Sequence, residues 1–378
     1  MSNHFSNNTP QCILCGRCLE VCPLFQITGH EELSPRGKAF LIQNLTHQEL
    51  SPKEASQLAG LCTGCRKCTR ICPQGIDLPP RIARLKAGHP HWKAWIWSRI
   101  LKNRKFFLPL MRLSGSVAPN SFSLLNLFRA SYRQSLAMFR LVSSPAHKAQ
   151  KAVLFPGCLG RFLRPDLTTR AGNILTSLGF EVLTTPNWEC CGFPLEQAGL
   201  VEEAALCREK NLEIWQKLNR PLVYTFCATC LEALAGTSPQ ARLSSGQDEL
   251  GSQTAELSSL IPELPLKQVS RAKNPDLVWH EPCHGTQRTG AILQRTLSAY
   301  GKRLTLHQGN CCGLGGSFRI QSPQLSVQMA QALWQKLSPQ ENSICLTECS
   351  GCLIQLASTH PPGTGVAHWL ELLERESN

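Results

Sequence analysis

The features that mark export, a membrane span or nucleotide binding are missing from this chain of 378 residues. The first twelve residues are polar and lack the apolar core of a signal peptide, so we expect a cytoplasmic protein. No uninterrupted apolar run reaches the roughly 18 residues of a spanning helix. No P-loop occurs, and no G-x-G-x-x-G opens a dinucleotide-binding fold, so we do not expect the chain itself to hold a flavin.

Acidic residues are absent from one long stretch. No Asp or Glu lies between Asp77 and Asp166, whereas residues 78–165 carry 16 Lys and Arg. The other residues have 23 basic and 26 acidic side chains, so this stretch holds the whole basic excess of the chain. Its interleaved aromatic residues are Trp92, Trp95, Trp97, Phe106, Phe107, Phe128, Tyr132 and Phe139.

Three interpretations of this basic aromatic segment stay open. Lys and Arg gain roughly 1 kcal/mol each near anionic headgroups and Trp prefers the interface, which fits the inner face of a membrane. A docking surface for an acidic partner subunit fits equally well. In the third interpretation the aromatic side chains pack in an ordinary helical connection. We expect no nucleic-acid partner, because no recognised binding module is present.

The sequence does contain many cysteines, 20 in all. In a reducing cytosol, so many cysteines indicate metal ligands or redox chemistry rather than disulfides. Eight of them form two copies of C-x-x-C-x-x-C-x-x-x-C-P, in 12–23 and 62–73. In two-cluster ferredoxins, three cysteines of such a run bind one cluster and the fourth binds the other.

This exchange of fourth ligands predicts two [4Fe–4S] cubane clusters. The first set is Cys12, Cys15, Cys18 and Cys72, and the second set is Cys62, Cys65, Cys68 and Cys22. Zinc knuckles are the alternative, although zinc sites usually use separated C-x-x-C pairs. Arg17, Arg66 and Lys67 lie inside the loops, where they either raise the reduction potential of a cluster or are ordinary solvated charges.

A second duplication occupies the rest of the chain. Cys158, Cys190–Cys191–Gly192 and Cys227-x-x-Cys230 recur as Cys283, Cys311–Cys312–Gly313 and Cys349-x-x-Cys352. This repeat predicts two similar units with five thiols each. Adjacent cysteines can face one cluster only where the backbone turns sharply, which the following glycine permits. The span from Cys283 to Cys311 is four residues shorter than its counterpart, so the second pocket need not match the first.

Secondary-structure patterns differ between the two parts of the chain. The first 85 residues show helical patterns over 35–45 and 52–61 and no convincing strand. After residue 150, strands alternate with helices, which predicts parallel sheets. The expected strands are 153–155, 181–183, 222–225, 277–279, 303–306 and 344–346, and the expected helices include 167–178 and 201–218. Each cysteine group follows a strand, at the sheet edge where α/β folds place ligands.

The first eight cysteines resemble the all-helical ferredoxin domain of quinone-linked dehydrogenases such as fumarate reductase. The other pattern resembles the CCG domain of heterodisulfide reductase subunits, whose five cysteines can hold a non-cubane [4Fe–4S] cluster. The resemblance implies one or two such clusters, on Cys158, Cys190, Cys191, Cys227 and Cys230 and on Cys283, Cys311, Cys312, Cys349 and Cys352. Cys207 and Cys345 are expected to be buried structural thiols.

The order of these parts resembles the iron–sulfur subunit of bacterial glycolate oxidase and its relatives in D-lactate and glycerol-3-phosphate dehydrogenases. The residues 34–37, 311–329 and 368–372 share in the resemblance. It implies an α+β multidomain fold, an all-α two-cluster ferredoxin domain followed by two tandem α/β CCG units with small parallel sheets. The expected parts are 1–85 (ferredoxin-like domain), 86–150 (basic aromatic helical connector), 151–236 (first CCG unit), 237–274 (linker and surface loop, with 236–260 read as loop) and 275–378 (second CCG unit).

The resemblance implies an electron-transfer subunit. A 2-hydroxy acid loses a hydride whereas clusters take electrons singly, so we expect an FAD-containing dehydrogenase partner and electron delivery toward quinone. Two alternatives stay open, a heterodisulfide-reductase-like thiol–disulfide oxidoreductase and the iron–sulfur subunit of a glycerol-3-phosphate dehydrogenase. No residue is expected to be catalytic. His280 and His284 are expected to be core or hydrogen-bonding residues, and Glu189 and Glu281 lie where they could relay protons.

Overall fold

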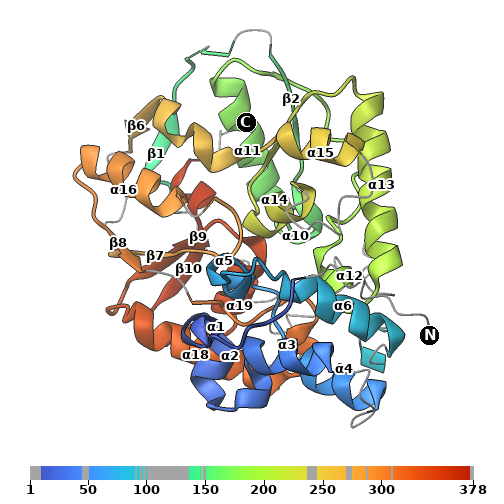
Figure 1. The fold of residues 1–378 in the computed structure, drawn as a ribbon. Helices are drawn as coiled ribbons and strands as arrows, with labels where there is room; N and C mark the ends of the chain where they lie inside the picture. Colours follow the sequence, from blue (N-terminus) through green and yellow to red (C-terminus); the bar gives the residue numbers. More distant parts are fainter. Residues whose placement is uncertain are drawn as a thin grey trace.

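The fold is seen in a computed structural model (Figure 1). It describes residues 10–44, 51–89, 92–93, 96, 99, 136–144, 146–147, 150–235, 245–269, 275–286, 288–307 and 310–374. Most of the basic aromatic segment, including Trp95, Trp97, Phe106, Phe107, Phe128 and Tyr132, lies outside the described residues. Of its other aromatic residues, Trp92 is 64 % exposed and Phe139 is 1 % exposed. The three interpretations of this segment therefore stay predictions.

The described residues between 10 and 89 form helices and no strand, as predicted. The helices are α1 (Arg17–Val21), α2 (Pro23–Thr28), η1 (Glu31–Leu33), α3 (Pro35–Gln43), α4 (Pro52–Gly60), α5 (Lys67–Ile71) and α6 (Leu78–Gly88). Ser34 begins α3 by accepting a hydrogen bond from the Gly37 amide, and Ser51 with Glu54 forms a capping box on α4. These helices lie in the lower part of Figure 1, where α2 contacts a helix of the second unit and α6 contacts helices of the first unit.

The first α/β unit is built on a four-stranded parallel sheet. Its strands are β2 (Lys151–Leu154), β3 (Glu181–Val182), β4 (Leu222–Thr225) and β5 (Thr254–Glu256), in the order β3-β2-β4-β5. Its helices are α10 (Gly157–Phe162), α11 (Pro165–Ser177), α12 (Phe193–Gln197), α13 (Val201–Lys217), α14 (Ala228–Leu234) and α15 (Ser245–Ser252). Parallel strands joined by helices place all carboxyl ends at one edge.

The second unit repeats this topology. Its strands are β7 (Leu277–His280), β8 (Leu304–His307), β9 (Ile344–Thr347) and β10 (Gly365–His368), in the order β10-β9-β7-β8 and all parallel. Its helices are α16 (Thr289–Ala299), α17 (Phe318–Gln321), α18 (Pro323–Leu337), α19 (Ser350–Ala357) and η5 (Trp369–Leu372). Each strand of one sheet has its counterpart at the same place in the other, which agrees with the predicted duplication.

The segment between the units differs from its prediction. The expectation of a surface loop over 236–260 is wrong for the described residues from 245 onward. They form α15, the sheet strand β5 and the 3₁₀ helix η4 (Leu257–Glu263), with Leu257 fully buried. Beyond them β6 (Leu266–Gln268) pairs with β1 (Phe139–Leu141). The Ser, Gln and Gly content of this segment suggested a loop. The apolar residues at its carboxyl end instead pack into a hydrophobic core together with residues of both units.

Both units share one hydrophobic core. Leu154 and Leu175 of the first unit and Trp279 and Leu346 of the second belong to the same buried cluster, and η4 contributes Ile261. Because the two sheets pack through this common core, their carboxyl edges are held in a fixed relation. Among the described residues, no helix combines the length and the apolar character needed to cross a bilayer.

Candidate metal centres

The two ferredoxin-type loops have the same backbone conformation. Leu14 and Gly64 occupy equivalent positions with φ of 55° and 70°, and Gly16 and Arg66 occupy the next equivalent pair with φ of 79° and 56°. Left-handed residues at alternate positions wind each loop tightly, so that its first three cysteines surround a common space. A five-residue helix then ends at the fourth cysteine of each run, Cys22 or Cys72.

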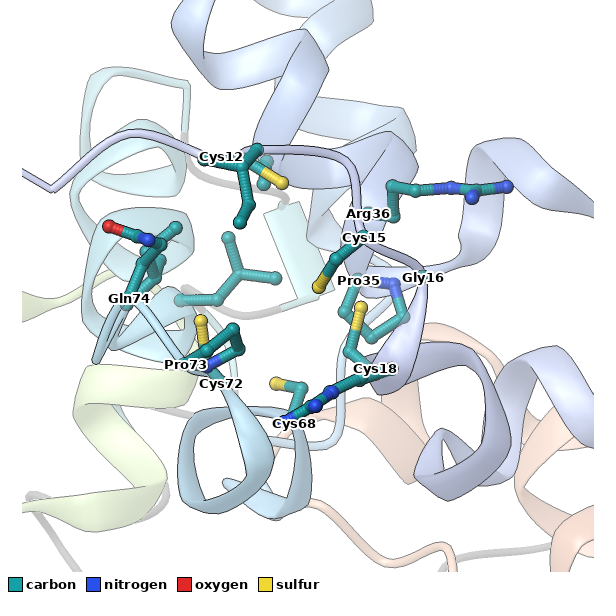
Figure 2. Close-up of a pocket in the computed structure, with 15 residues that line it drawn as sticks. Cys12, Cys15, Gly16, Cys18, Pro35, Arg36, Cys68, Cys72, Pro73 and Gln74 are labelled. Carbon is teal, nitrogen blue, oxygen red and sulfur yellow. The ribbon is translucent and has the colours of Figure 1, made fainter.

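The fourth cysteine of each run lies with the first three of the other run. One cavity is lined by Cys12, Cys15, Cys18 and Cys72 together with Cys68 (Figure 2). A second cavity is lined by Cys62, Cys65, Cys68 and Cys22. In Figure 2 the guanidinium of Arg36 turns away from the first cavity. The cysteines of each predicted set thus line one cavity, with Cys68 lining both, and the binding of clusters by these sets stays a prediction.

The ten cysteines of the duplicated units lie at the carboxyl edges of the two sheets. Cys158 follows β2, Cys190 and Cys191 follow β3, and Cys227 begins α14 after β4. Cys283, Cys311, Cys312 and Cys349 occupy the corresponding places after β7, β8 and β9. Cys230 and Cys352 lie in the first turns of α14 and α19. The sheet topology therefore gathers each set of five from three separate strand ends.

The glycine after each cysteine pair is needed for the turn. Gly192 has φ of 90° and Gly313 has φ of 86°, a backbone conformation that residues with a Cβ rarely adopt. A Cβ at Gly313 would also lie 2.7 Å from the Ser326 carbonyl oxygen, and one at Gly192 would lie 3.0 Å from that of Ala204. The requirement is therefore both conformational and steric.

Both sets of cysteines open into one shared cavity, which the sequence did not predict. Its thiols are Cys158, Cys191, Cys227, Cys230, Cys283, Cys311, Cys312, Cys349 and Cys352. The tenth, Cys190, is buried in the adjacent core and does not line the cavity. Thr229 of the first unit lies 3.2 Å from the Sγ of Cys349 in the second, so the two sets meet. Sequence spacing cannot indicate this, because the meeting of the two edges depends on how the units pack.

A series of thiol contacts joins the ferredoxin-type region to this shared cavity. The contacting pairs are Cys65–Cys311, Cys311–Cys312, Cys312–Cys352, Cys352–Cys349, Cys349–Cys227, Cys227–Cys230 and Cys230–Cys191. Hydrogen bonds from Cys230 and Cys349 hold the pKa of Cys227 well below its usual range. A hydrogen bond from Cys311 has the same effect on the pKa of Cys312. Each unit therefore has a thiol that favours the thiolate form, which is the form that binds metal.

The histidines and the remaining thiols occupy structural positions. His284 is buried, with Nδ1 3.2 Å from Thr229 Oγ1 and Nε2 3.0 Å from the Gly64 carbonyl oxygen, which agrees with the predicted hydrogen-bonding role. His280 is fully buried, and burial lowers its pKa to about 3. Cys345 is fully buried in β9, as expected, and burial raises its pKa to about 12. Cys207 on α13 is only half-buried, which differs from the expectation, because it packs at the margin of two buried clusters.

The predicted proton-relay glutamates make ordinary contacts. The Oε2 of Glu281 accepts a hydrogen bond from Trp279 Nε1 at 2.8 Å, and burial raises the pKa of this carboxyl group. The backbone amide of Glu189 donates to Asn211 Oδ1 at 2.8 Å. A role in proton transfer stays a prediction for both.

Ion pairs dock the second loop onto the first α/β unit and a hydrogen bond docks it onto the second, and sequence reasoning missed most of these residues. Arg66 pairs with Asp77 and with Glu232 on α14, and Arg70 pairs with the same Glu232 at 3.3 Å. Arg70 Nη1 also donates to the Cys283 carbonyl oxygen at 2.6 Å. Arg66 is therefore neither a free solvated charge nor an unpaired positive charge, because two carboxylates compensate it.

The donor set fits iron–sulfur clusters by its chemistry. Soft thiolates in sets of four or five are the ligands that such clusters use. The two ferredoxin-type sets line a cavity each, and nine of the ten cysteines of the CCG units line the shared cavity. Among the described residues, no group of three or more His, Cys, Asp or Glu side chains has the arrangement of ligands around a single metal ion.

Comparisons with known protein families agree with this assignment. Residues 9–76 match the 4Fe-4S dicluster domain, and residues 152–235 and 277–357 each match the cysteine-rich domain called CCG. These domains indicate several iron–sulfur clusters and favour them over the zinc alternative.

Individual relatives cover nearly the whole chain. The glycolate oxidase iron-sulfur subunit of Escherichia coli K12 is 24 % identical over 96 % of this chain and 93 % of its own length. The probable glycolate oxidase iron-sulfur subunit of Bacillus subtilis 168 is 22 % identical over 91 % of this chain and 87 % of its own. A relative from Methanosarcina mazei, named as one of the subunits of a dihydromethanophenazine:CoB–CoM heterodisulfide reductase, is 22 % identical over 90 % of this chain and 86 % of its own.

The order of the domains, the two cysteine patterns and these relatives agree with one another. The predicted α+β architecture, with a helical ferredoxin-like region followed by two units with small parallel sheets, is confirmed. The chain therefore contains a 4Fe-4S dicluster domain followed by two cysteine-rich CCG domains, and over nearly its whole length it is similar to iron-sulfur subunits of glycolate oxidases.

Proposed function

We propose that this chain is the electron-transfer subunit of a flavin-dependent 2-hydroxy-acid dehydrogenase of the glycolate or D-lactate type. The observation that carries the proposal is the series of thiol contacts from Cys65 through Cys311 to the shared cavity. Bound iron–sulfur clusters accept and release electrons one at a time. A chain that positions several of them in sequence conducts electrons between a donor and an acceptor, rather than carrying out hydride chemistry itself.

The ligand assignments form part of this proposal. Cys12, Cys15, Cys18 and Cys72 would hold the first cubane cluster, and Cys62, Cys65, Cys68 and Cys22 the second. Cys158, Cys190, Cys191, Cys227 and Cys230 would hold a cluster in the first CCG unit, and Cys283, Cys311, Cys312, Cys349 and Cys352 one in the second. The two cavities lined by exchanged cysteines support the first pair of sets. The position of the other cysteines at neighbouring strand ends supports the second pair of sets. Cys190 is the one member that does not line the shared cavity.

The partner follows from the chemistry of the substrate. Oxidising a 2-hydroxy acid removes a hydride, which a flavin can accept and then release as single electrons. An FAD-containing dehydrogenase partner is therefore the proposed donor, and quinone the proposed final acceptor. The relatives named as glycolate oxidase subunits support this substrate class.

One observation favours a second function, that of a thiol–disulfide oxidoreductase. Nine thiols from both units border a single cavity, so a disulfide that entered it would meet thiols of both units. The relative named as a heterodisulfide reductase subunit has nearly the same extent as this chain. For this function the cavity is a reaction site rather than the end of a conducting path.

Copurification separates these functions. The tagged full chain is isolated anaerobically from its native cells, its flavin content is measured, and glycolate, D-lactate or a disulfide is added. The first function predicts an FAD protein in the complex and bleaching of the iron–sulfur absorbance by a hydroxy acid, only while that protein is present. Substrate oxidation by the purified chain alone would contradict it. Reoxidation of the dithionite-reduced chain by a disulfide would establish the second function.

A further inference from the structure

Two lysine side chains are buried beside the second ferredoxin-type loop. Lys38 on α3 is 2 % exposed and Lys86 on α6 is 6 % exposed. The ammonium of Lys38 donates to the carbonyl oxygen of Leu61, the residue before Cys62, at 2.6 Å. The ammonium of Lys86 donates to the carbonyl oxygen of Gln197 at 2.9 Å. Two helices and the packing of α12 therefore hold these ammonium groups in place.

Neither lysine forms an ion pair with a carboxylate of the described residues, and each is hydrogen-bonded to carbonyl oxygens instead. Moving an ammonium group out of water costs several kcal/mol unless an opposite charge compensates it. Burial lowers the pKa of Lys86 to about 8, and the charge of Lys38 acts in the same direction. A protein that buries two such groups close together needs an anion near them.

Thiolates of the second cysteine set are the candidates for that anion. The carbonyl oxygen that Lys38 binds belongs to Leu61, directly before Cys62. The Lys86 side chain packs against Gly60, where an added Cβ would lie 3.1 Å from its Cε. Lys38 itself borders the cavity that this set lines. Both lysines are thus within electrostatic range of the same ligand set.

The first cysteine set has different surroundings. Cys15 is exposed, and the guanidinium of Arg36 at that cavity is paired with Glu31 at 2.8 Å and points away from the cysteines (Figure 2). The residues that line this cavity include no lysine but two arginines, the exposed Arg17 and the ion-paired Arg36. The two loops share a sequence pattern and a backbone conformation, but among the described residues only the second has buried lysines without a carboxylate partner beside it.

We propose that Lys38 and Lys86 are the counter-ions of the second cysteine set and raise the reduction potential there above that of the first set. The proposal rests on the proposed function, in which Cys62, Cys65, Cys68 and Cys22 hold a cluster. Adding an electron makes such a site more negative, and a nearby buried cation stabilises that form. The two lysines then make the second site the preferred place for an electron between the exposed first site and the shared cavity.

The test is a redox titration of the anaerobically prepared full chain, followed by electron paramagnetic resonance. The variants are Lys38→Met, Lys86→Met and the charge-retaining Lys38→Arg. Lys53→Met, which alters an exposed lysine on α4, is the matched control. The signal that Cys65→Ser alters identifies the second site. In Lys38→Met we expect its ratio of reduced to oxidised form at a fixed potential to fall about tenfold, a shift of about 59 mV for one electron.

The expected pattern is specific to charge and to one site. Lys86→Met shifts the same signal in the same direction, whereas Lys38→Arg and Lys53→Met leave it in place, and the first signal does not move. If both Met variants retain both signals at unchanged potentials, the proposal is overturned while the proposed function stands. Absence of iron and sulfide from the unaltered chain would instead overturn the proposed function. Where Lys38→Met fails to assemble, Lys86→Met with Lys86→Arg decides between these outcomes.

Discussion

The two ferredoxin-type loops have the same cysteine pattern but different surroundings in the fold. Leu14 and Gly64, and then Gly16 and Arg66, take the same left-handed conformation, so the local pattern determines the shape of the loop. The surroundings differ, because Cys15 is exposed whereas Cys65 is buried and contacts Cys311 of the second CCG unit. Cysteine spacing thus specifies a set of ligands, and the packing around it specifies what that set contacts and which charges surround it.

The largest effect expected from this comparison follows the loss of a ligand from the buried loop. Cys65→Ser should remove the second ferredoxin-type cluster, so the iron content of the chain falls. It should also interrupt the contact with Cys311, so the dithionite-reduced chain loses one spin–spin interaction between neighbouring clusters. Cys15→Ser, at the exposed loop, should lower iron content similarly and leave the signals of the CCG units unchanged. Iron analysis and electron paramagnetic resonance measure both. Equal effects of the two variants on the CCG signals would show that the loops are not distinct.

The second prediction compares glycines in the two regions. Gly313→Ala should lower the free energy of unfolding by about 3 kcal/mol, because a left-handed residue is strained and its Cβ would lie 2.7 Å from a carbonyl oxygen. Gly29→Ala is the matched variant, with φ of 67° and no atom within 4 Å of the added Cβ. It should cost only the conformational strain, about 1 kcal/mol. Urea unfolding of both variants checks the difference, and equal losses would refute the steric argument.

The third prediction concerns the ion pairs that dock the second loop. Glu232→Gln removes a partner from both Arg66 and Arg70, of which Arg66 is largely buried, and should cost about 2 kcal/mol of stability. The exposed pair of Arg220 and Glu249 provides the control. Glu249→Gln should change stability by about 0.5 kcal/mol or less, because surface pairs contribute little. Thermal unfolding at two salt concentrations measures both, and a loss at Glu249 as large as that at Glu232 would contradict the docking role.

The fourth prediction is a pH dependence of the second CCG unit. Burial lowers the pKa of His368 to about 4, and the ring is fixed by the Phe226 carbonyl oxygen and the Leu370 amide. The unfolded histidine binds a proton at a higher pH than the folded one, so stability falls as the pH drops from about 6.5 toward 4, by up to about 1.4 kcal/mol per pH unit. His368→Gln should flatten this slope in urea unfolding across that range. An unchanged slope would show that other groups control the loss of stability at low pH.

Much of the architecture could be predicted from the sequence, because each signal was local. Runs such as 222–225 became β4, and the proline after Ser34 and Ser51 marked the starts of α3 and α4. The strands β5 and β10 were missed, since Thr254–Glu256 and Gly365–His368 lack a continuous apolar run and gain their place from neighbouring strands. Local patterns do not contain that information.

The candidate site was predictable in its ligand types and not in its surroundings. The four cysteine sets follow from spacing and resemblance, and the glycine turns follow from the adjacent cysteines. Lys38, Lys86 and Glu232 gave no signal, because their burial beside the cysteines arises from contacts between distant segments. The shared cavity has the same origin, since it forms where the carboxyl edges of two separately coded sheets meet.

The central claim is that these thiols hold iron–sulfur clusters in a conducting series. Quantitative iron and acid-labile sulfide analysis of the anaerobically isolated full chain tests it most directly. We expect about eight iron and eight sulfide per chain from the two cubane sets, with about four more of each for every occupied CCG unit. Zinc in place of iron, or iron without sulfide, would contradict it.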